Sequence, residues 1–187
     1  MSFFLKLLRR WSCRPWSYAR FGAKSHVAFD VERQNPHQIS IGDGVYVARG
    51  TRLLCDQEGS RTSSILLKDR VYIGNNSVIS AWGKIVIGCD VLCGDGVYIG
   101  SSAHQYQDVN MPPARQPLSA PGVLVVEDDV WIGRHVTVIG AITLGKHSVI
   151  GANSLVLDDV PPFTVCAGSP ARPIKRFDPI LAQWVRI

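Results

Sequence analysis

The sequence predicts an all-β fold, a parallel β-solenoid built from repeats of six residues. Aliphatic residues occupy every sixth position from residue 126 to residue 156 without interruption. An α-helix repeats at about 3.6 residues and a strand at about 2, so neither explains a strict spacing of six. The repeat indicates very short strands joined by tight corners, each directing one side chain to a common axis. The positions are Val126, Ile132, Val138, Leu144, Ile150 and Val156.

The same repeat occurs upstream in three shorter blocks that differ in phase. The changes of phase predict insertions near residues 54–66, 80–86 and 104–125. If three repeats close one triangular coil, the repeats together predict about five coils. An ordinary sandwich of short strands predicts irregular spacing instead. The blocks are Ile41, Val47, Leu53; Leu67, Ile73, Ile79; and Ile87, Cys93, Ile99.

The length of 187 residues fits one domain with appendages. We predict a basic, apolar arm or cap over residues 1–24 and the solenoid over residues 25–175, with a projecting loop at 104–125. Residues 176–187 have the pattern of a short amphipathic cap. Short helical segments are therefore expected at both ends of the solenoid.

Positive charge is concentrated in the arm. Residues 1–24 contain six basic residues and no acidic ones, whereas the rest has 14 basic and 15 acidic residues. A nearly neutral solenoid argues against a nucleic-acid partner. The arm is expected to cap the first coil or to lie on an anionic membrane surface, and the two roles are compatible. It lacks the pattern of a signal peptide, so we predict a cytoplasmic protein, peripheral at the inner face of the membrane.

The five cysteines form no CxxC pair and no even framework. Cys93 occupies an aliphatic position of the repeat. The cysteines are therefore interpreted as small buried residues in a reducing compartment.

The repeat breaks after Ile99, where chemistry is expected. The chain continues through His104 into a proline-rich stretch, residues 109–122, that cannot form a solenoid face. Such a stretch must project as a loop, and loops on rigid scaffolds often carry function. His104 stands where the loop departs, which makes it a candidate functional residue.

The repeats, His104 in its loop and the run from Asp128 to Phe177 (DDVWIGRHVTVIGAITLGKHSVIGANSLVLDDVPPFTVCAGSPARPIKRF) resemble the hexapeptide-repeat acyltransferases. The branch that looks most similar contains the sugar and polysaccharide O-acetyltransferases, including the maltose and galactoside acetyltransferases. The resemblance covers residues 65–177, roughly 60% of the chain. It implies a left-handed parallel β-helix, a homotrimer with active sites between subunits, and acetyl-CoA as co-substrate.

The resemblance also implies roles for individual residues. His104 corresponds to the general base and Trp131, in DDVWIG, to a tryptophan that lines the site near the acetyl donor. Ala152, in IGANS, matches a backbone position along the pantetheine arm of coenzyme A. Arg172 and Lys175, in SPARPIK, match cations near the phosphates of the coenzyme.

The acceptor side departs from the sugar-acetylating enzymes. An acceptor-binding Asn of the family falls near Gly74, with Asn75 and Asn76 beside it, and an acceptor-binding Asp falls near Trp82. We therefore assign Asn75, Asn76 and Trp82 as candidate substrate-binding residues, and the departures leave the acceptor sugar open.

Each assignment has a structural alternative. Trp131 is suited to packing at a surface or subunit contact, and Arg172 and Lys175 to a solvated cluster of charge. Some hexapeptide solenoids bind metal through three histidines, but His135 and His147 are twelve residues apart and fall on different faces. We therefore expect no metal site.

The resulting functional prediction is an acetyl-CoA-dependent O-acetyltransferase that modifies a sugar hydroxyl of a surface polysaccharide or its precursor. The alternatives are an antibiotic acetyltransferase, a sugar-amine N-acetyltransferase and a solenoid scaffold without catalysis.

Overall fold

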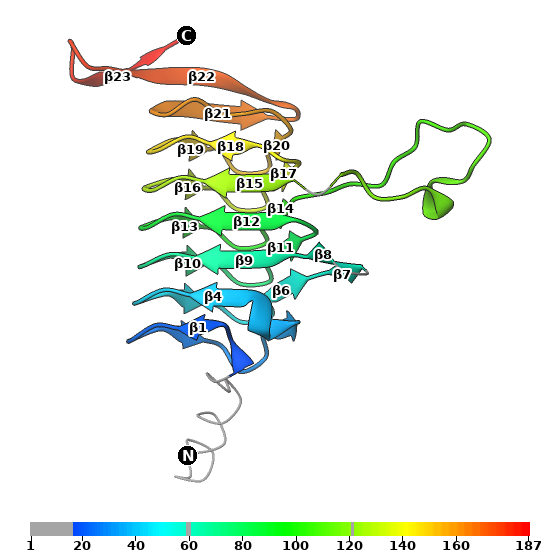
Figure 1. The fold of residues 1–187 in the computed structure, drawn as a ribbon. Helices are drawn as coiled ribbons and strands as arrows, with labels where there is room; N and C mark the ends of the chain where they lie inside the picture. Colours follow the sequence, from blue (N-terminus) through cyan, green and yellow to red (C-terminus); the bar gives the residue numbers. More distant parts are fainter. Residues whose placement is uncertain (1–16, 59–60, 121) are drawn as a thin grey trace.

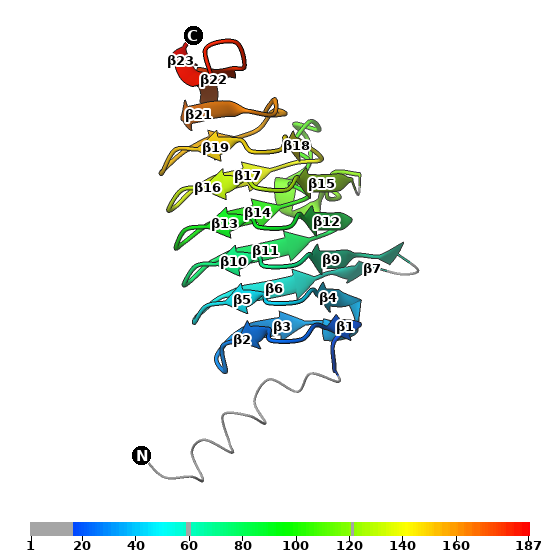
Figure 2. The same cartoon turned by 90° about the vertical axis from the view of Figure 1, so that its left-hand side faces the viewer.

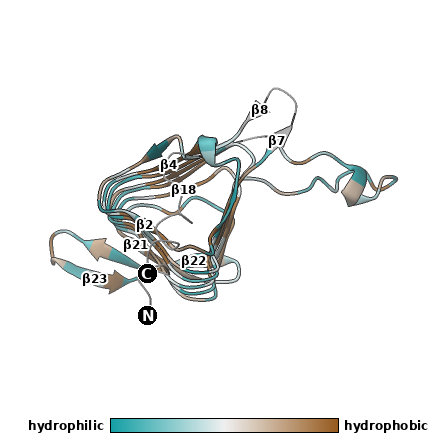
Figure 3. Ribbon diagram, turned by 90° about the horizontal axis from the view of Figure 1, so that it is seen from below, coloured by the Kyte–Doolittle hydropathy of each residue, from teal (hydrophilic) through white to brown (hydrophobic). Residues whose placement is uncertain are grey.

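The computed structural model describes residues 17–58, 61–120 and 122–187. Within them the chain winds upward as a stack of triangular coils with three parallel faces (Figure 1). The strands of the face at the front of Figure 1 run leftward while the chain climbs towards the C-terminus, which is the left-handed sense. The triangular outline is visible along the axis in Figure 3. The predicted all-β parallel solenoid is confirmed.

Each face takes one short strand from each coil. Face A contains β1 (Arg20–Phe21), β4 (Ile39–Ile41), β9 (Ser64–Leu67), β12 (Lys84–Ile87), β15 (Val123–Val126) and β18 (Thr143–Leu144). Face C contains β3 (Glu32–Gln34), β6 (Arg52–Cys55), β11 (Val78–Ala81), β14 (Tyr98–Gly100), β17 (Thr137–Ile139) and β20 (Leu155–Val156).

Face B, which is towards the viewer in Figure 2, extends beyond the coils into an antiparallel end. It contains β2 (His26–Val27), β5 (Tyr46–Val47), β10 (Tyr72–Ile73), β13 (Leu92–Cys93), β16 (Trp131–Ile132), β19 (Val149–Ile150), β21 (Thr164–Gly168), β22 (Ala171–Asp178) and β23 (Gln183–Arg186).

The repeat positions form the core. All six aliphatic residues between Val126 and Val156 are at most 2% exposed. Parallel pairing puts each side chain directly over its counterpart in the coil below, as Ile132 lies over Cys93 and under Ile150. Continuous stacking buries apolar surface that one coil alone would leave in water.

The described residues form six coils rather than the predicted five or so. The additional coil is the first, whose repeat positions are Phe21, Val27 and Arg33. Its strands pair with those of the second coil, for example Phe21 with Ile41. Arg33 interrupts the aliphatic pattern that the sequence analysis relied on. The described part of the predicted arm, residues 17–24, therefore belongs to the solenoid, while residues 1–16 lie outside the described residues.

Four-residue corners join face A to face B and face B to face C. The third residue of each of the six described A–B corners has a left-handed backbone, and five of these residues are not glycine. His147 holds this position at an A–B corner, with φ of 56°, and His135 holds the equivalent position at a B–C corner, with φ of 54°. These histidines lie at different corners, as expected from their spacing. Among the described residues no group of three or more His, Cys, Asp or Glu side chains could hold a metal ion.

The insertions leave the stack between faces C and A. The first forms the hairpin β7 (Gln57–Glu58) and β8 (Arg61–Thr62), and the short 3-10 helix η2 (Pro36–Gln38) occupies the same corner of the first coil. The second is only a two-residue corner at Trp82–Gly83. The long loop runs over residues 101–122, earlier than the predicted 104–125, because residues 123–125 already pair in β15. Figure 1 shows it projecting far from the solenoid.

The C-terminal segment forms strands rather than the expected helix. Residues 176–187 were expected to form a helical cap, but they lie in the antiparallel hairpin β22–β23. The reason is the open edge of β21, which offers hydrogen-bonding groups that β22 pairs with. Phe177 and Trp184 are opposite each other across the hairpin, and their rings pack edge to face with centroids 5.6 Å apart.

Three of the cysteines, Cys55, Cys93 and Cys166, are buried in the core, and Cys89 is half-buried. Burial raises the pKa of the Cys93 thiol to about 12. Cys13 lies outside the described residues. No helix in the described ranges is both long and apolar enough to cross a bilayer.

Candidate functional site

An exposed row of side chains runs along the outer surface of face B. Strand pairing aligns Tyr72, Leu92, Trp131 and Val149, one from each of four successive coils. Alternation along a strand turns Trp131 outward while Ile132 enters the core. Trp131 is 53% exposed and Ile132 is fully buried, so the ring of Trp131 is open to solvent on the outer surface of face B.

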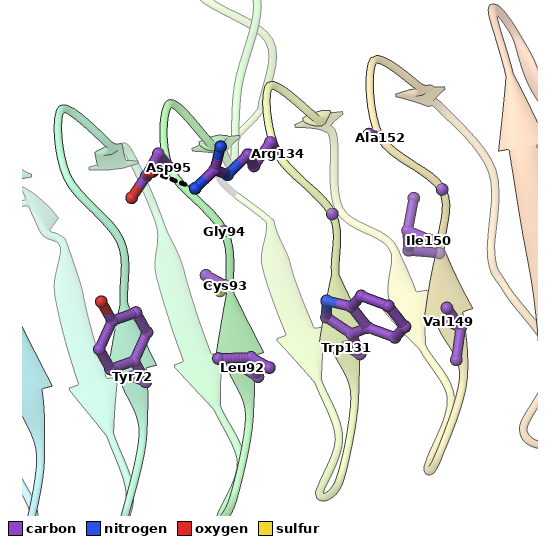
Figure 4. A pocket seen from close by; sticks show the side chains of 12 residues that line it. Tyr72, Leu92, Cys93, Gly94, Asp95, Trp131, Arg134, Val149, Ile150 and Ala152 are labelled. Carbon is purple, nitrogen blue, oxygen red and sulfur yellow. Dashed lines mark ion pairs between the residues drawn. The ribbon is translucent and has the colours of Figure 1, made fainter.

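A groove of about 500 Å³ lies between this row and the corner that joins faces B and C. Figure 4 shows Trp131 on one side of it and Ala152 on the neighbouring coil. A side chain at Gly133 would come within 2.7 Å of the backbone nitrogen of Ala152, so the two coils approach closely here. The structure thus brings together two of the predicted cofactor residues, Trp131 and Ala152, in what we call the face-B groove.

The rim of the face-B groove is formed by a second row at the B–C corners. Asn75, Asp95, Arg134 and Ala152 hold the second corner position in successive coils. Asp95 bridges its neighbours: its Oδ1 accepts hydrogen bonds from the backbone N–H and the Nδ2 of Asn75, at 2.9 and 3.1 Å. Its Oδ2 lies 3.2 Å from the guanidinium of Arg134, as Figure 4 marks. Ala152 carries only a methyl group, so the groove opens above Arg134.

These contacts determine the charge of the rim. The hydrogen bonds from Asn75 and the nearby positive charge of Arg134 lower the pKa of Asp95 from its ordinary value.

Asn75 and Asn76 also line a shallower hollow of about 460 Å³ beside the groove, which they share with Asp95 and Arg49. The candidate acceptor residues Asn75 and Asn76 therefore adjoin the face-B groove.

The two predicted phosphate-binding cations lie further along the axis, on β22. Arg172 is in an exposed ion pair with Asp158, at 3.2 Å. Lys175 pairs with Val165, which in turn pairs with Val149. Lys175 therefore continues the outward row that contains Trp131, and it lies three strands further along this row. At the usual strand spacing of about 4.8 Å, the distance between the two residues is about 14 Å.

His104 is at the neck of the long loop, at the edge where face C meets face A. The face-B groove lies at the other edge of face C, where it meets face B. A β-bridge joins His104 to Leu118. Two backbone hydrogen bonds close the neck, from Gln105 to Pro117 at 3.0 Å and from Ser119 to Ala103 at 2.8 Å. The imidazole is exposed and has no hydrogen-bond partner within the described residues. The side chain is free to meet a substrate or another chain.

The tip of the loop is organised by one buried amide. Gln116 is 8% exposed. Its Nε2 donates to the carbonyls of Asp108 and Met111, at 2.9 and 2.7 Å, and its Oε1 accepts from the N–H of Asp108 at 3.2 Å. The projecting loop therefore has an internal structure of its own.

Trp82 lies in the corner between faces C and A, next to the neck of the loop. The hydroxyl of Ser101 accepts hydrogen bonds from the backbone N–H groups of Trp82 and Gly83, at 3.0 and 3.2 Å. The indole Nε1 is buried and has no partner in the described part of the chain. Trp82 thus shares an edge of the solenoid with His104, whereas Asn75 and Asn76 lie at another corner.

A single chain therefore carries the predicted site in two parts. Trp131, Ala152, Asn75 and Asn76 lie on face B or its corner with face C, and His104 and Trp82 lie at the edge between faces C and A. The structure does not bring the candidate base to the groove within one chain.

Sequence reasoning missed several groove residues, namely Tyr72, Leu92, Asp95 and Arg134. Tyr72 and Leu92 are 20 residues apart, but the long loop stretches the next step, from Leu92 to Trp131, to 39 residues. The signal that could have found them is the phase of the repeat on each side of the loop, which aligns each outward residue with its neighbour in the next coil.

Residues 124–158 match the family model described as bacterial transferase hexapeptide (six repeats). The Escherichia coli protein WbbJ, provisionally named a lipopolysaccharide biosynthesis O-acetyltransferase, is 30% identical over 165 residues, covering 84% of this chain and 82% of WbbJ. The chain belongs to the hexapeptide-repeat acyltransferase family.

A second relative and one solved structure extend the comparison. A Mycobacterium tuberculosis protein provisionally named an acetyltransferase is 28% identical over 74% of this chain, which spans only 44% of that relative. The N-acyltransferase AntD of Bacillus cereus, solved with dTDP and 3-hydroxybutyryl-CoA, superimposes with a TM-score of 0.76 at 16% identity. The superposition covers 95% of this chain and 90% of AntD. It agrees with the left-handed parallel β-helix.

Proposed function

We propose that this acyltransferase is an acetyl-CoA-dependent O-acetyltransferase that acts on a sugar hydroxyl. The observation that carries the proposal is the open face-B groove, in which Trp131 and Ala152 meet, together with an exposed His104 at the loop neck. The name of WbbJ supports a sugar acceptor and transfer to oxygen.

In this proposal His104 is the general base. The acceptor hydroxyl gives its proton to the imidazole as its oxygen forms a bond to the thioester carbon, and the carbon–sulfur bond then breaks. The imidazolium returns the proton to the departing thiolate, so charge and protons balance. An imidazole suits this exchange near neutral pH. A covalent acyl-enzyme is not required, and the buried Cys93 thiol, whose pKa burial raises, is unsuited to forming one.

The coenzyme is proposed to lie along the outer surface of face B. Trp131 offers an exposed ring beside the reactive end, and the methyl group of Ala152 leaves space for the pantetheine arm. Lys175 lies about 14 Å from Trp131 along the same row, within the reach of an extended coenzyme, and Arg172 is on the same strand. These two cations suit the phosphates of the donor.

The complete site is proposed to form between copies of the chain, in a homotrimer. The physical argument is the separation of His104 and Trp82 from the face-B groove, since a base must come within hydrogen-bond reach of its proton. A neighbouring copy can bring its loop neck to the groove. Asn75 and Asn76, at the rim, are then suited to hydrogen-bonding acceptor hydroxyls.

The acceptor is proposed to be a surface polysaccharide, its lipid-linked repeat or an activated precursor. Such acceptors are found at the inner face of the cytoplasmic membrane, where the basic, apolar residues 1–24 could provide peripheral contact. The proposal therefore locates the enzyme in the cytoplasm and at this membrane face.

The first test is release of free thiol from acetyl-CoA in the presence of a panel of sugar acceptors. We expect His104→Ala to abolish transfer, with acetyl-CoA affinity unchanged. His37→Ala is the matched control, because His37 is exposed on the first coil, away from the groove, and should leave transfer intact. Equal rates for the His104 variant and the wild type would refute the role of His104.

A mixing experiment tests whether the site is shared. His104→Ala and Trp131→Ala chains should each be inactive alone. When they are coexpressed, some sites combine an intact His104 with an intact groove, so part of the activity should return. Failure of the mixture, with both variants assembled together, would refute a site formed between copies.

Transfer to a sugar amine is the second candidate, and the close superposition on the N-acyltransferase AntD favours it. The two products differ chemically, because an ester is cleaved by mild base and an amide is not. Loss of the acetyl group from the product in mild base supports the O-acetyltransferase.

A further inference from the structure

The outer part of the C-terminal hairpin, residues 176–187, holds no residue that the proposed donor site uses. We propose that the hairpin β22–β23 is a docking element for an anionic lipid bilayer. It lies at the C-terminal end of the stack, beyond the last coil, and Figure 1 shows its turn projecting past the edge of the solenoid. A flat surface can therefore approach it without meeting the coils.

The turn of the hairpin holds two apolar side chains in water. Ile180 is 92% exposed and Leu181 is 58% exposed. The backbone beneath them is ordered, because Oδ1 of Asp178 accepts hydrogen bonds from the N–H groups of both residues, at 2.8 and 3.1 Å. The exposure is thus built into a defined turn.

Further apolar groups accompany the turn. Ile174 is 44%, Trp184 37% and Ile187 75% exposed. A tryptophan with one apolar side and one polar N–H is suited to the boundary between lipid and water. Together these side chains give the hairpin the apolar component of a membrane contact.

Charge identifies the kind of partner. Residues 171–187 carry four basic side chains and one acidic one, a net charge of +3, whereas residues 25–170 carry ten basic and fourteen acidic ones, a net charge of −4. Lys175 and Arg186 are directly opposite each other across the hairpin. Like charges in this arrangement are destabilising, and neither has an ion-pair partner in the described parts of the chain. The donor phosphates would meet Lys175, and an anionic surface would meet Arg186 and the exposed Arg176.

The same charges argue against a second copy of the hairpin as the occupant. A symmetric contact would bring the Lys175 and Arg186 pair against an identical pair. An anionic bilayer accepts both components at once: the apolar turn enters the interface, and Arg176 and Arg186, which the proposed donor site does not use, meet lipid phosphates. An anionic lipid surface is therefore the partner that the hairpin fits.

The test is sedimentation of the full-length protein with phosphatidylcholine vesicles, with and without phosphatidylglycerol. We expect binding only to the anionic vesicles and a decrease in binding as salt is raised. The double variant Ile180→Asp, Leu181→Asp should reduce the partition coefficient at least about tenfold, because two apolar side chains no longer enter the interface. Val109→Asp is the matched control, since Val109 is also 92% exposed but lies in the long loop.

Residues 1–24 are present in every variant, so any difference between variants belongs to the hairpin. Equal vesicle binding by the wild type and the double variant would overturn the proposal. So would a change in oligomeric state without a change in vesicle binding, which would assign the turn to a contact between copies. Unchanged acetyl-CoA affinity and melting temperature in the double variant separate this result from misfolding and from failure of the donor site.

Discussion

Gln116 gives a quantitative test of whether the long loop is a structured element. Its side chain makes three hydrogen bonds within the loop tip, to both backbone groups of Asp108 and to the carbonyl of Met111. A hydrogen bond typically contributes about 0.5–1.5 kcal/mol net, so Gln116→Ala should cost the folded loop about 3 kcal/mol. Each 1.4 kcal/mol is a factor of ten, and local opening of the loop should therefore become about 100-fold more frequent.

Hydrogen–deuterium exchange of residues 105–117 measures this opening. We expect exchange to accelerate by about two orders of magnitude in the Gln116 variant, with no loss of protection in the coils, because the loop projects from the solenoid. Gln105→Ala is the control within the same loop, since only the backbone of Gln105 is hydrogen-bonded in the described structure. Unchanged exchange in the Gln116 variant would show that the amide does not hold the loop together.

Two further predictions concern the solenoid. Ile132→Ala removes a fully buried side chain stacked between Cys93 and Ile150, so unfolding in urea should show a loss of about 2–5 kcal/mol, whereas Val123→Ala, half-exposed, should lose far less. The pKa of Asp95 is lowered in the folded protein, so its carboxylate stabilises the fold above the unfolded pKa, and this is lost as pH falls through the folded value. Asp95→Asn should therefore lower the urea midpoint at neutral pH and have no effect in strong acid; an equal loss at both would contradict this.

The core could be predicted from the sequence because residues at the repeat positions stack on one another in successive coils. Ile132 and Ile150 pair in neighbouring coils because both occupy the same position of the six-residue repeat, and this position can be identified from the sequence alone. The first coil was missed because Arg33 stands where an aliphatic residue was sought. The prediction of a C-terminal helix was wrong because β22 pairs with the free edge of β21. This edge is a tertiary feature, which an amphipathic sequence pattern does not reveal.

The candidate site was predictable only in part. Trp131 and Ala152 were assigned from a resemblance, and the structure brings them to one groove. Asp95 and Arg134 were not found, because the contact between their side chains crosses the 101–122 loop and no fixed spacing connects them. The position of His104 relative to the groove depends on a neighbouring chain, which a single sequence does not describe.

Calorimetric titration of the protein with acetyl-CoA tests whether the face-B groove is the donor site. We expect saturable binding with about one coenzyme per chain. Trp131→Ala, which removes the exposed ring from the groove, should weaken this binding, and His104→Ala should leave it unchanged. Absence of binding to the wild type would contradict the proposed roles of Trp131, Ala152, Arg172 and Lys175, and with them the assignment of the face-B groove as the donor site.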